Sequence, residues 1–240
     1  MRNIGILFLL SVSLVACDKA KYDVSGPTPE TLEVELENTE KAPDGTATFN
    51  EFSLPVEAFT GRCLSEDNTK DASIFGYELV VVIDKAKDGQ TFKVYKNGEL
   101  VGDWMTSTGR ELKEAEETKS GSYSRMITPT GIFTPTKGRL YENYTSYTWK
   151  TDMPYAIFFN GGVAIHETNQ TQYLGSRASG GCVRLHEDVA EDFFKMVKFE
   201  SGMGKTVALD RNGCVKKTTE GMPQVVEGYR TLIIVRDSSN

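Results

Sequence analysis

The chain has 240 residues and a formal net charge of −7, and this length suffices for one domain with a sizeable core plus shorter attached segments. Residues 18–60 hold ten Asp or Glu against three Lys, so the remainder is close to neutral and has no basic region of the kind that binds nucleic acid. The chain has four cysteines but no Cys-x-x-Cys pair, and it has only two histidines, so it lacks the usual ligands of a zinc site. We expect neither a metal nor a cofactor.

The first residues have the pattern of a secretory signal. An apolar run over residues 4–16 follows Arg2 and is broken only by one glycine and two serines. It is too short to span a bilayer, but it fits the apolar part of a signal peptide. It ends in Leu-Val-Ala-Cys17, which resembles the lipobox of bacterial lipoproteins, in which the cysteine is acylated; an ordinary cleaved signal is the alternative. We expect a lipoprotein signal peptide at residues 1–16 and a lipid on Cys17 that attaches the protein to a membrane.

Residues 17–62 have the composition of a tether. They are acidic and rich in Thr, and prolines interrupt them repeatedly. As a flexible coil, this stretch would place its ends roughly 35–40 Å apart, which lifts the following domain away from the membrane. Alternation of apolar residues with Glu at residues 31–37 leaves open a short strand added to a sheet edge.

From residue 77 onward, the pattern favours strands. Asn97-Gly98 lies between two alternating runs and is a strong signal for a hairpin turn. Residues 187–198 carry apolar side chains at helical spacing with acids in the first turn, so we expect a helix there. The charged residues 110–121 are expected to form a solvated loop or a frayed helix. Strands are predicted at residues 78–84, 91–95, 100–106, within 128–136, and at 155–159, 163–166, 182–185, 206–210 and 231–235.

A histidine and a cysteine sixteen positions apart are the candidates for chemistry. A thiol attacks a carbonyl only as thiolate, so Cys182 needs a nearby base or positive charge. His166, at the end of an apolar strand, is the candidate base. The alternatives are a buried structural thiol and a polar histidine with satisfied hydrogen bonds. His186 is a weaker candidate, since four residues of strand place it roughly 13 Å from Cys182.

The residues next to Cys182 suit a catalytic turn. Gly180 and Gly181 permit a tight turn, and the amides of Gly181 and Cys182 are candidate donors to an oxyanion. Ser179 is expected either to bond the backbone of the turn or to orient His166.

Strand alternation turns Cys182 and Arg184 to one face, with Val183 and Leu185 toward a core. Arg184 is then suited to binding a substrate carboxylate, or else pairs with Glu167 or Asp188. Tyr155 is a candidate for the pocket wall, the alternative being a place in the core.

Four ordered blocks resemble the L,D-transpeptidase catalytic domain family, also called the YkuD type. They are Ser107 to Gly109, Thr128 to Phe133, Met153 to His166, and Ser179 to Leu185. One position departs from the family's pattern, because the family usually has a histidine where this chain has Gly180. The upstream histidine, which corresponds to His166, is the family's usual general base.

The resemblance covers about residues 77–209 and implies a fold and a domain division. The implied fold is mainly β: a β-sandwich of mixed sheets with one or two short helices. We expect the catalytic domain at residues 63–215 and a C-terminal extension at 216–240 that ends in a strand.

The resemblance also implies acyl transfer on peptidoglycan stem peptides. Cys182 would form a thioester, and an amine would resolve it, giving a 3-3 crosslink or attachment to another acceptor such as an envelope protein. If water resolves the thioester, the protein is an L,D-carboxypeptidase or an amidase. A non-catalytic wall-binding lipoprotein is the alternative of another class. The expected location is the bacterial cell envelope, lipid-anchored and facing the periplasm.

Cys63 and Cys214 flank the region of resemblance. In an oxidising compartment we expect them to form a disulfide. A rival pairing of Cys182 with Cys214 would remove the nucleophile.

Overall fold

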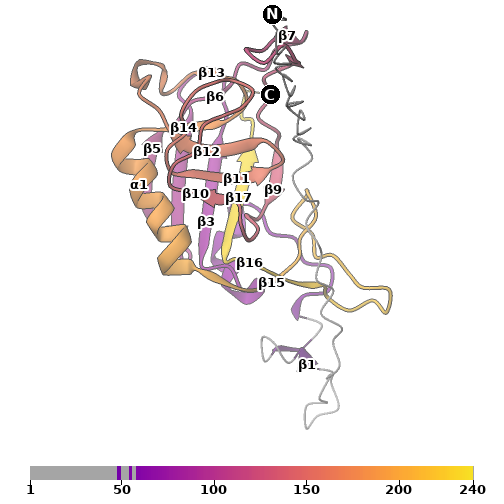
Figure 1. Ribbon diagram of the computed structural model, residues 1–240. Coiled ribbons are helices and arrows are strands. Elements are labelled where there is room, and N and C mark those ends of the chain that lie inside the picture. The colour runs from indigo at the N-terminus through magenta and orange to yellow at the C-terminus, as the bar shows by residue number, and fades with distance from the viewer. Residues whose placement is uncertain (1–47, 50–53, 56–57, 240) are drawn as a thin grey trace, which may run out of the picture.

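The computed structural model describes residues 48–49, 54–55 and 58–239. The predicted signal peptide, Cys17 and the possible strand at residues 31–37 lie outside the described residues. In the described part the chain is mainly β, with two larger sheets and only short helices, as predicted (Figure 1). None of the described helices has the length and apolar character needed to cross a bilayer.

The larger sheet has five strands in the order β5-β4-β3-β17-β9. These strands are β3 (Leu79–Asp84), β4 (Thr91–Lys96), β5 (Glu99–Met105), β9 (Gly131–Phe133) and β17 (Thr231–Arg236). β3 and β17 are parallel, and the other pairs are antiparallel. The predicted turn joins β4 to β5, with positive φ at both Asn97 (50°) and Gly98 (82°), as a type I′ turn requires.

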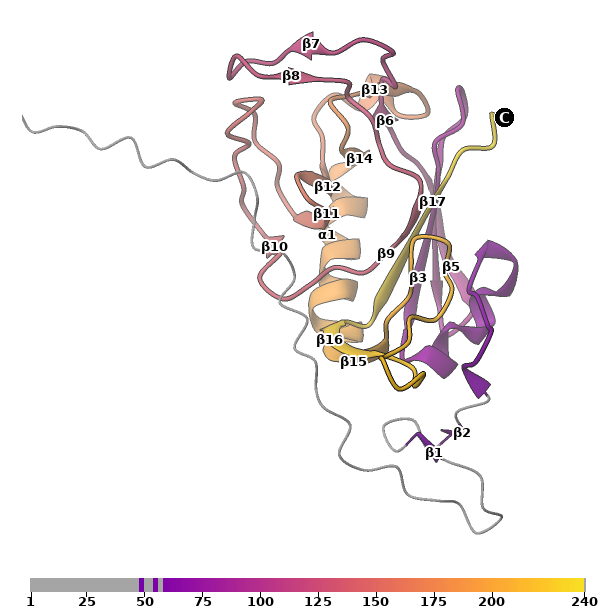
Figure 2. The same ribbon diagram turned by 90° about the vertical axis from the view of Figure 1, so that its right-hand side faces the viewer.

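The second sheet carries the candidate chemistry. Its order is β10-β11-β12-β14, formed by β10 (Leu140–Tyr141), β11 (Ala156–Asn160), β12 (Val163–Glu167) and β14 (Val183–Leu185). β12 and β14 are parallel, and the other pairs are antiparallel. Figure 2 shows the two sheets as separate layers. Buried side chains from both sheets and from helix α1 (Glu187–Lys195) meet in one core between them, so the sheets form a sandwich.

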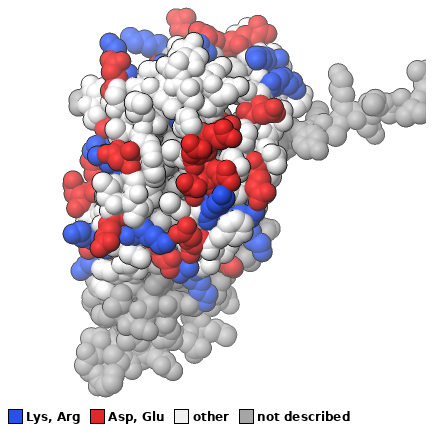
Figure 3. Space-filling view, turned by 90° about the vertical axis from the view of Figure 1, so that its left-hand side faces the viewer, with Lys and Arg blue, Asp and Glu red and all other residues white. Residues whose placement is uncertain are grey.

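Each sheet also has a smaller core on its outer face. The 3-10 helix η2 (Glu66–Phe75) covers the five-stranded sheet and contributes Phe75 beside Val80 and Ile234. Met153, Phe158 and their neighbours cover the four-stranded sheet. The face that bears α1 shows Lys and Arg interspersed with Asp and Glu (Figure 3).

Several elements differ from the sequence prediction. Residues 110–121, expected as a loop or frayed helix, belong in part to a small hairpin of β7 (Glu116–Glu117) and β8 (Tyr123–Ser124). The helix predicted at 187–198 ends as α-helix at Lys195 and continues as the π-helical turn η4 (Met196–Ser201). The strand predicted at 206–210 begins earlier, as β15 (Met203–Val207), and pairs with β16 (Val225–Tyr229), which was not predicted. The other short elements are β1 (Thr48–Phe49), β2 (Leu54–Pro55), β6 (Thr108–Gly109), β13 (Arg177–Ser179) and η3 (Thr171–Tyr173).

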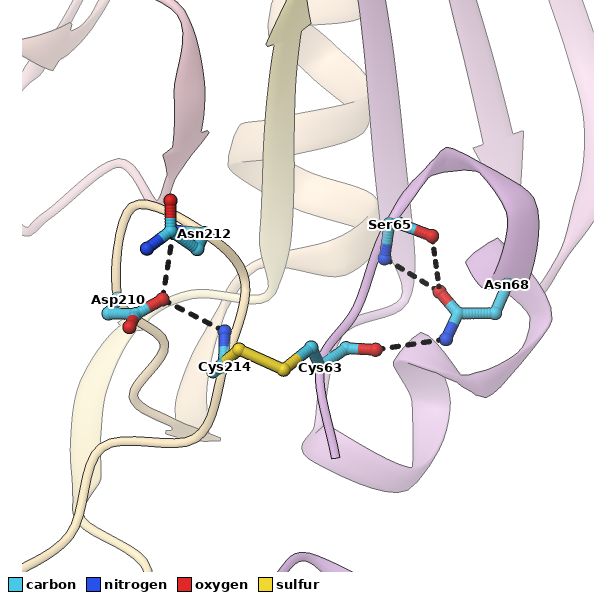
Figure 4. Close-up of a disulfide and its surroundings, with 6 residues drawn as sticks. All are labelled: Cys63, Ser65, Asn68, Asp210, Asn212 and Cys214. Atoms are coloured by element: carbon cyan, nitrogen blue, oxygen red, sulfur yellow. Dashed lines mark hydrogen bonds between the residues drawn. A yellow bond between two sulfur atoms is a disulfide. The ribbon is translucent and has the colours of Figure 1, made fainter. Parts of the chain in front are cut away.

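A disulfide joins Cys63 to Cys214, across 151 positions of sequence, and Cys182 is free (Figure 4). The pairing expected from the sequence is therefore the one present, and the rival pairing with Cys182 is not. Asp210 Oδ1 accepts from the amide of Cys214 at 2.9 Å, and Asn68 Nδ2 donates to the carbonyl of Cys63 at 3.0 Å. Closing so long a loop stabilises the fold by about 5 kcal/mol in the chain-entropy model.

Candidate active site

The parallel pairing of β12 with β14 brings the candidate residues to one face of the four-stranded sheet. In its register His166 lies opposite Arg184, and Ile165 lies opposite Val183. Ile165 and Val183 are buried in the core between the sheets. Alternation turns His166, Cys182 and Arg184 to the opposite face, where all three line one cleft.

The cleft has a volume of about 520 Å³, within the usual range for sites that bind small molecules or peptides. Its lining combines both charge signs with an aromatic ring. The cations are Arg110, Lys119 and Arg184, the acids are Asp152 and Glu167, and the ring is Trp149.

His166 is arranged as a neutral base. The residue is 5% exposed, and its Nδ1 lies 2.5 Å from the carbonyl oxygen of Glu167. A carbonyl can only accept, so Nδ1 carries the proton and Nε2 is left with a free lone pair. Burial lowers the pKa of His166 from 6.5 to about 4, and the charge of Arg184 acts in the same direction. The imidazole is therefore unprotonated at neutral pH.

Cys182 is arranged as a neutral thiol at rest. It is half-buried, and its Sγ lies 3.9 Å from the carbonyl oxygen of Gly162. Burial raises the pKa of the Cys182 thiol, although the backbone of Ala164 and the charge of Arg184 favour the thiolate. In the described chain no hydrogen bond joins the thiol to the imidazole. A neutral thiol and a neutral imidazole that line the same cleft suit proton transfer during the attack itself.

Ser179 holds the turn that carries Cys182. Its Oγ donates to the carbonyl of Cys182 at 2.5 Å and accepts from the amide of Gly181 at 3.0 Å. Ser179 thus bonds the backbone of the turn, the first of its two predicted roles. The expectation for Gly181 as an oxyanion donor is corrected, because its amide is engaged inside the turn. The amide of Cys182 remains as the candidate donor.

Gly180 makes room for Trp149, a residue that the sequence did not single out. A Cβ at position 180 would lie 2.7 Å from Cε2 of the Trp149 indole, which is too close for both to keep their places. The loop that carries Trp149 is closed by backbone bonds from Ser146 to Thr151 and from Met153 to Tyr144. The indole therefore occupies the side of the turn toward which a larger residue at 180 would project.

Arg184 faces the cleft and forms an ion pair with neither Glu167 nor Asp188. Its Nη1 donates to Oε1 of Gln170 at 2.9 Å, and its buried Nε has no partner within the described residues. Asp188 instead lies 3.7 Å from His186, which is exposed at the start of α1 and does not line the cleft. Arg184 is thus left able to bind a carboxylate.

The expectation that Tyr155 forms part of the pocket wall is corrected. Tyr155 packs against the core beside α1, with its ring centroid 5.8 Å from that of Phe194. Its neighbours Met153 and Pro154 line the cleft in its place. The backbone at Tyr155 has φ 55°, a left-handed conformation immediately before β11, and the side chain takes the alternative that the sequence left open, a place against the core.

The residues that the structure describes contain no group of three or more His, Cys, Asp or Glu that could hold a metal ion. What the cleft offers chemically is a thiol, an unprotonated imidazole and a positively charged wall. This set suits acyl transfer through a covalent intermediate.

Residues 78–226 match the family model described as the L,D-transpeptidase catalytic domain, YkuD. Among solved structures, the chain is similar to an L,D-transpeptidase from Mycobacterium smegmatis, with 20% identity, a TM-score of 0.43, and 66% of this chain and 58% of that chain covered. The L,D-transpeptidase from Xylanimonas cellulosilytica is 23% identical, with a TM-score of 0.42, and the match covers 65% of this chain and 60% of that chain. The LD transpeptidase LdtMt1, solved in complex with imipenem, is 18% identical, with a TM-score of 0.41, and the match covers 66% of this chain and 59% of that chain. The chain thus spans less than two thirds of the length of each. Among curated proteins, none matches the chain.

Proposed function

Because the chain belongs to the L,D-transpeptidase catalytic domain family, whose model matches more than half of it, we propose that it is a cysteine-dependent acyltransferase acting on peptidoglycan stem peptides. The observation that carries the proposal is the register of β12 with β14. It turns the His166 imidazole and the Cys182 thiol into the same cleft from neighbouring strands.

In the acylation step, the Cys182 thiol rotates from the Gly162 carbonyl toward His166 and attacks a peptide carbonyl of the stem. Nε2 of His166 takes the thiol proton as the S–C bond forms. The tetrahedral oxyanion accepts from the Cys182 amide. The C–N bond then breaks, and the imidazolium returns the proton to the leaving amine of the terminal D-alanine.

In the second step an amine resolves the thioester. His166 removes a proton from the attacking amine, the C–N bond forms and the thiol leaves with a proton. An amine from another stem gives a 3-3 crosslink, and an amine of an envelope protein gives a covalent attachment. The acids Asp152 and Glu167 in the cleft attract an acceptor that arrives as an ammonium ion; it loses one proton to solvent before the neutral amine attacks. The positive wall formed by Arg110, Lys119 and Arg184 suits the carboxylates of the donor.

The test is incubation of the protein with a stem tetrapeptide, alone and with an amine acceptor, followed by mass spectrometry of the products. Transfer predicts a crosslinked or amine-capped product that forms only with the acceptor. Tripeptide alone, formed at the same rate with or without acceptor, would contradict transfer and indicate an L,D-carboxypeptidase or amidase. Binding without any product would indicate a non-catalytic wall-binding protein.

We further propose that the folded domain, which extends beyond the expected boundary at residue 215 to include β17, works in the cell envelope, attached through lipidated Cys17 and the acidic tether. The motif around Cys17 supports this location. Metabolic labelling with a palmitate analogue in a bacterial host should label the full chain and not the Cys17→Ser variant. Equal labelling of both would contradict lipidation at this cysteine.

A further inference from the structure

Thr128 connects the turn of the nucleophile to the rest of the domain. It lies just before β9 and is 0% exposed. Its Oγ1 donates to the carbonyl of Gly181 at 2.7 Å and accepts from the amide of Gly109 at 2.8 Å. One hydroxyl therefore joins the end of β6 to the residue that precedes Cys182.

The main chain of Thr128 is held by an ion pair between buried Lys85 and partly buried Glu111. Nζ of Lys85 donates to the carbonyl of Thr128 at 2.7 Å, and Oε1 of Glu111 accepts from its amide at 2.9 Å. Nζ of Lys85 also lies 2.9 Å from Oε2 of Glu111, and Lys85 is 4% exposed. Every polar group of Thr128 is thus fixed by a named partner.

An ion pair with one buried and one partly buried partner needs a reason other than stability. Taking Lys85 and most of the Glu111 side chain out of water costs free energy that their attraction only partly offsets, and apolar residues in such places are often as stable. Glu111 also adopts a left-handed backbone, with φ 54°, which an L residue rarely does. A requirement for the exact orientation of Thr128 accounts for both features.

The peptide bond carries that orientation to the nucleophile. The carbonyl of Gly181 and the amide of Cys182 belong to one planar trans peptide, in which C=O and N–H point in opposite directions. A donor that fixes the carbonyl therefore fixes the direction of the amide. Gly181 itself has φ 123°, which strains any residue with a side chain, and a Cβ there would lie in tight contact, 3.0 Å from the carbonyl oxygen of Ile127.

We propose that Lys85, Glu111 and Thr128 are positioning residues that aim the Cys182 amide at the oxyanion formed during acylation. None of the three lines the cleft, so they act through the Gly181–Cys182 peptide. The inference rests on the proposed function for its effect on rate, whereas the positioning itself can be measured without any activity.

The central comparison is Thr128→Val against Thr128→Ser. Valine keeps the volume but loses both hydroxyl bonds, and serine keeps the hydroxyl. Thr231→Val is the matched control, because Thr231 is also 0% exposed and its Oγ1 lies 3.0 Å from Ser201 Oγ, away from the site. Thermal unfolding of all three variants identifies any loss of folded protein.

Two reagents separate positioning from loss of the thiol. The proposed function leads us to use the β-lactam imipenem, which is bound in the LdtMt1 structure, as an acylating probe of Cys182. Its acylation of a thiol passes through an oxyanion, whereas alkylation by iodoacetamide does not. We expect Thr128→Val to slow imipenem acylation about ten- to a hundredfold, and to change alkylation by less than about threefold. Thr128→Ser should recover most of the acylation rate, and Thr231→Val should keep all of it.

The second measurement is amide hydrogen exchange in the peptide that spans residues 179–185. Exchange there should rise about tenfold or more in Thr128→Val and in the double variant Lys85→Met/Glu111→Gln, and stay unchanged in Thr231→Val. If wild-type protein forms no imipenem adduct, the proposed function fails, and the exchange result still decides the positioning. Unchanged exchange in Thr128→Val would overturn the inference, as would an equal slowing of acylation and alkylation.

Discussion

At the scale of single residues, burial acts on the two reactive groups in opposite directions. It lowers the pKa of the His166 imidazole and raises the pKa of the Cys182 thiol, so each is neutral at rest. In the proposed mechanism, the imidazole is then free to accept a proton over a wide pH range, and the thiolate forms only as the substrate carbonyl is attacked. A resting thiolate–imidazolium pair would require the reverse shifts.

The pH dependence of imipenem acylation follows from these shifts. The imidazole becomes protonated only near pH 4, so the rate should stay level from neutral pH down to about pH 5 and fall below it. Stopped-flow measurements between pH 4 and 9 provide the check. A fall centred near pH 6.5, the ordinary value for histidine, would show that burial does not tune this imidazole.

Gly180 and Trp149 give a second prediction at this scale. Gly180→Ala forces the indole to move, so we expect a shift in tryptophan emission and acylation about tenfold slower. Gly228→Ala is the control, since its Cβ would meet Pro135 at an ordinary 3.4 Å. If Gly180→Ala retains both the emission and the rate of the wild type, the indole does not constrain the turn.

The sequence predicts part of this site for a clear reason. The alternation of side chains along a strand is a local property, so the sequence alone predicts that Cys182 and Arg184 lie on the same face. The contact of Trp149 with Gly180 depends on how segments distant in sequence pack. Neither periodicity nor spacing carries that information, and the expectations for Tyr155 and Gly181 were wrong for the same reason.

At the scale of elements, the strands of the two larger sheets were predicted except for β10, whereas β7, β8 and β16 were not. β3 and β17 are mostly buried runs of apolar residues, and β4 alternates buried with half-buried residues, so their own side chains specify them. β7, β8 and β16 depend on neighbours for their pairing. Helix η2 did have local signals, namely a capping box at Ser65 with Asn68 and a left-handed Gly76 at its end.

The C-terminal strand β17 was predicted as a strand, but its position inside the larger sheet was not. Residues 216–240 were expected as an extension that ends in a strand, and that strand, β17, lies between β3 and β9 within the larger sheet. Parallel pairing with β3 joins segments about 150 positions apart, and sequence pattern does not encode such a partner.

A substitution in β17 tests its importance. Ile233 is 0% exposed, and Ile233→Ala should lower the free energy of unfolding by about 2–5 kcal/mol in urea titrations. Val101→Ala on the exposed edge strand β5 should change it by less than about 0.5 kcal/mol. Equal, small effects would mean that the C-terminal segment is dispensable to the fold.

At the scale of the whole molecule, the disulfide holds the segment before η2 to the loop after β15, and it is separate from the cleft. Removing it with Cys63→Ser/Cys214→Ser should lower stability by about 2–5 kcal/mol in urea titrations. Because neither cysteine lines the cleft, folded protein at 25 °C should keep its acylation rate within about threefold. A folded variant without acylation would show that the bridge shapes the site.

The account depends most on joint action of His166 and Cys182, and intact-protein mass spectrometry over time with imipenem tests it most directly. Wild-type protein should gain the mass of one imipenem, Cys182→Ala should gain none, and His166→Gln should react about 10²- to 10⁴-fold more slowly while remaining folded. An adduct on Cys182→Ala, or an unchanged rate in His166→Gln, would contradict the assignment of these two residues as nucleophile and base.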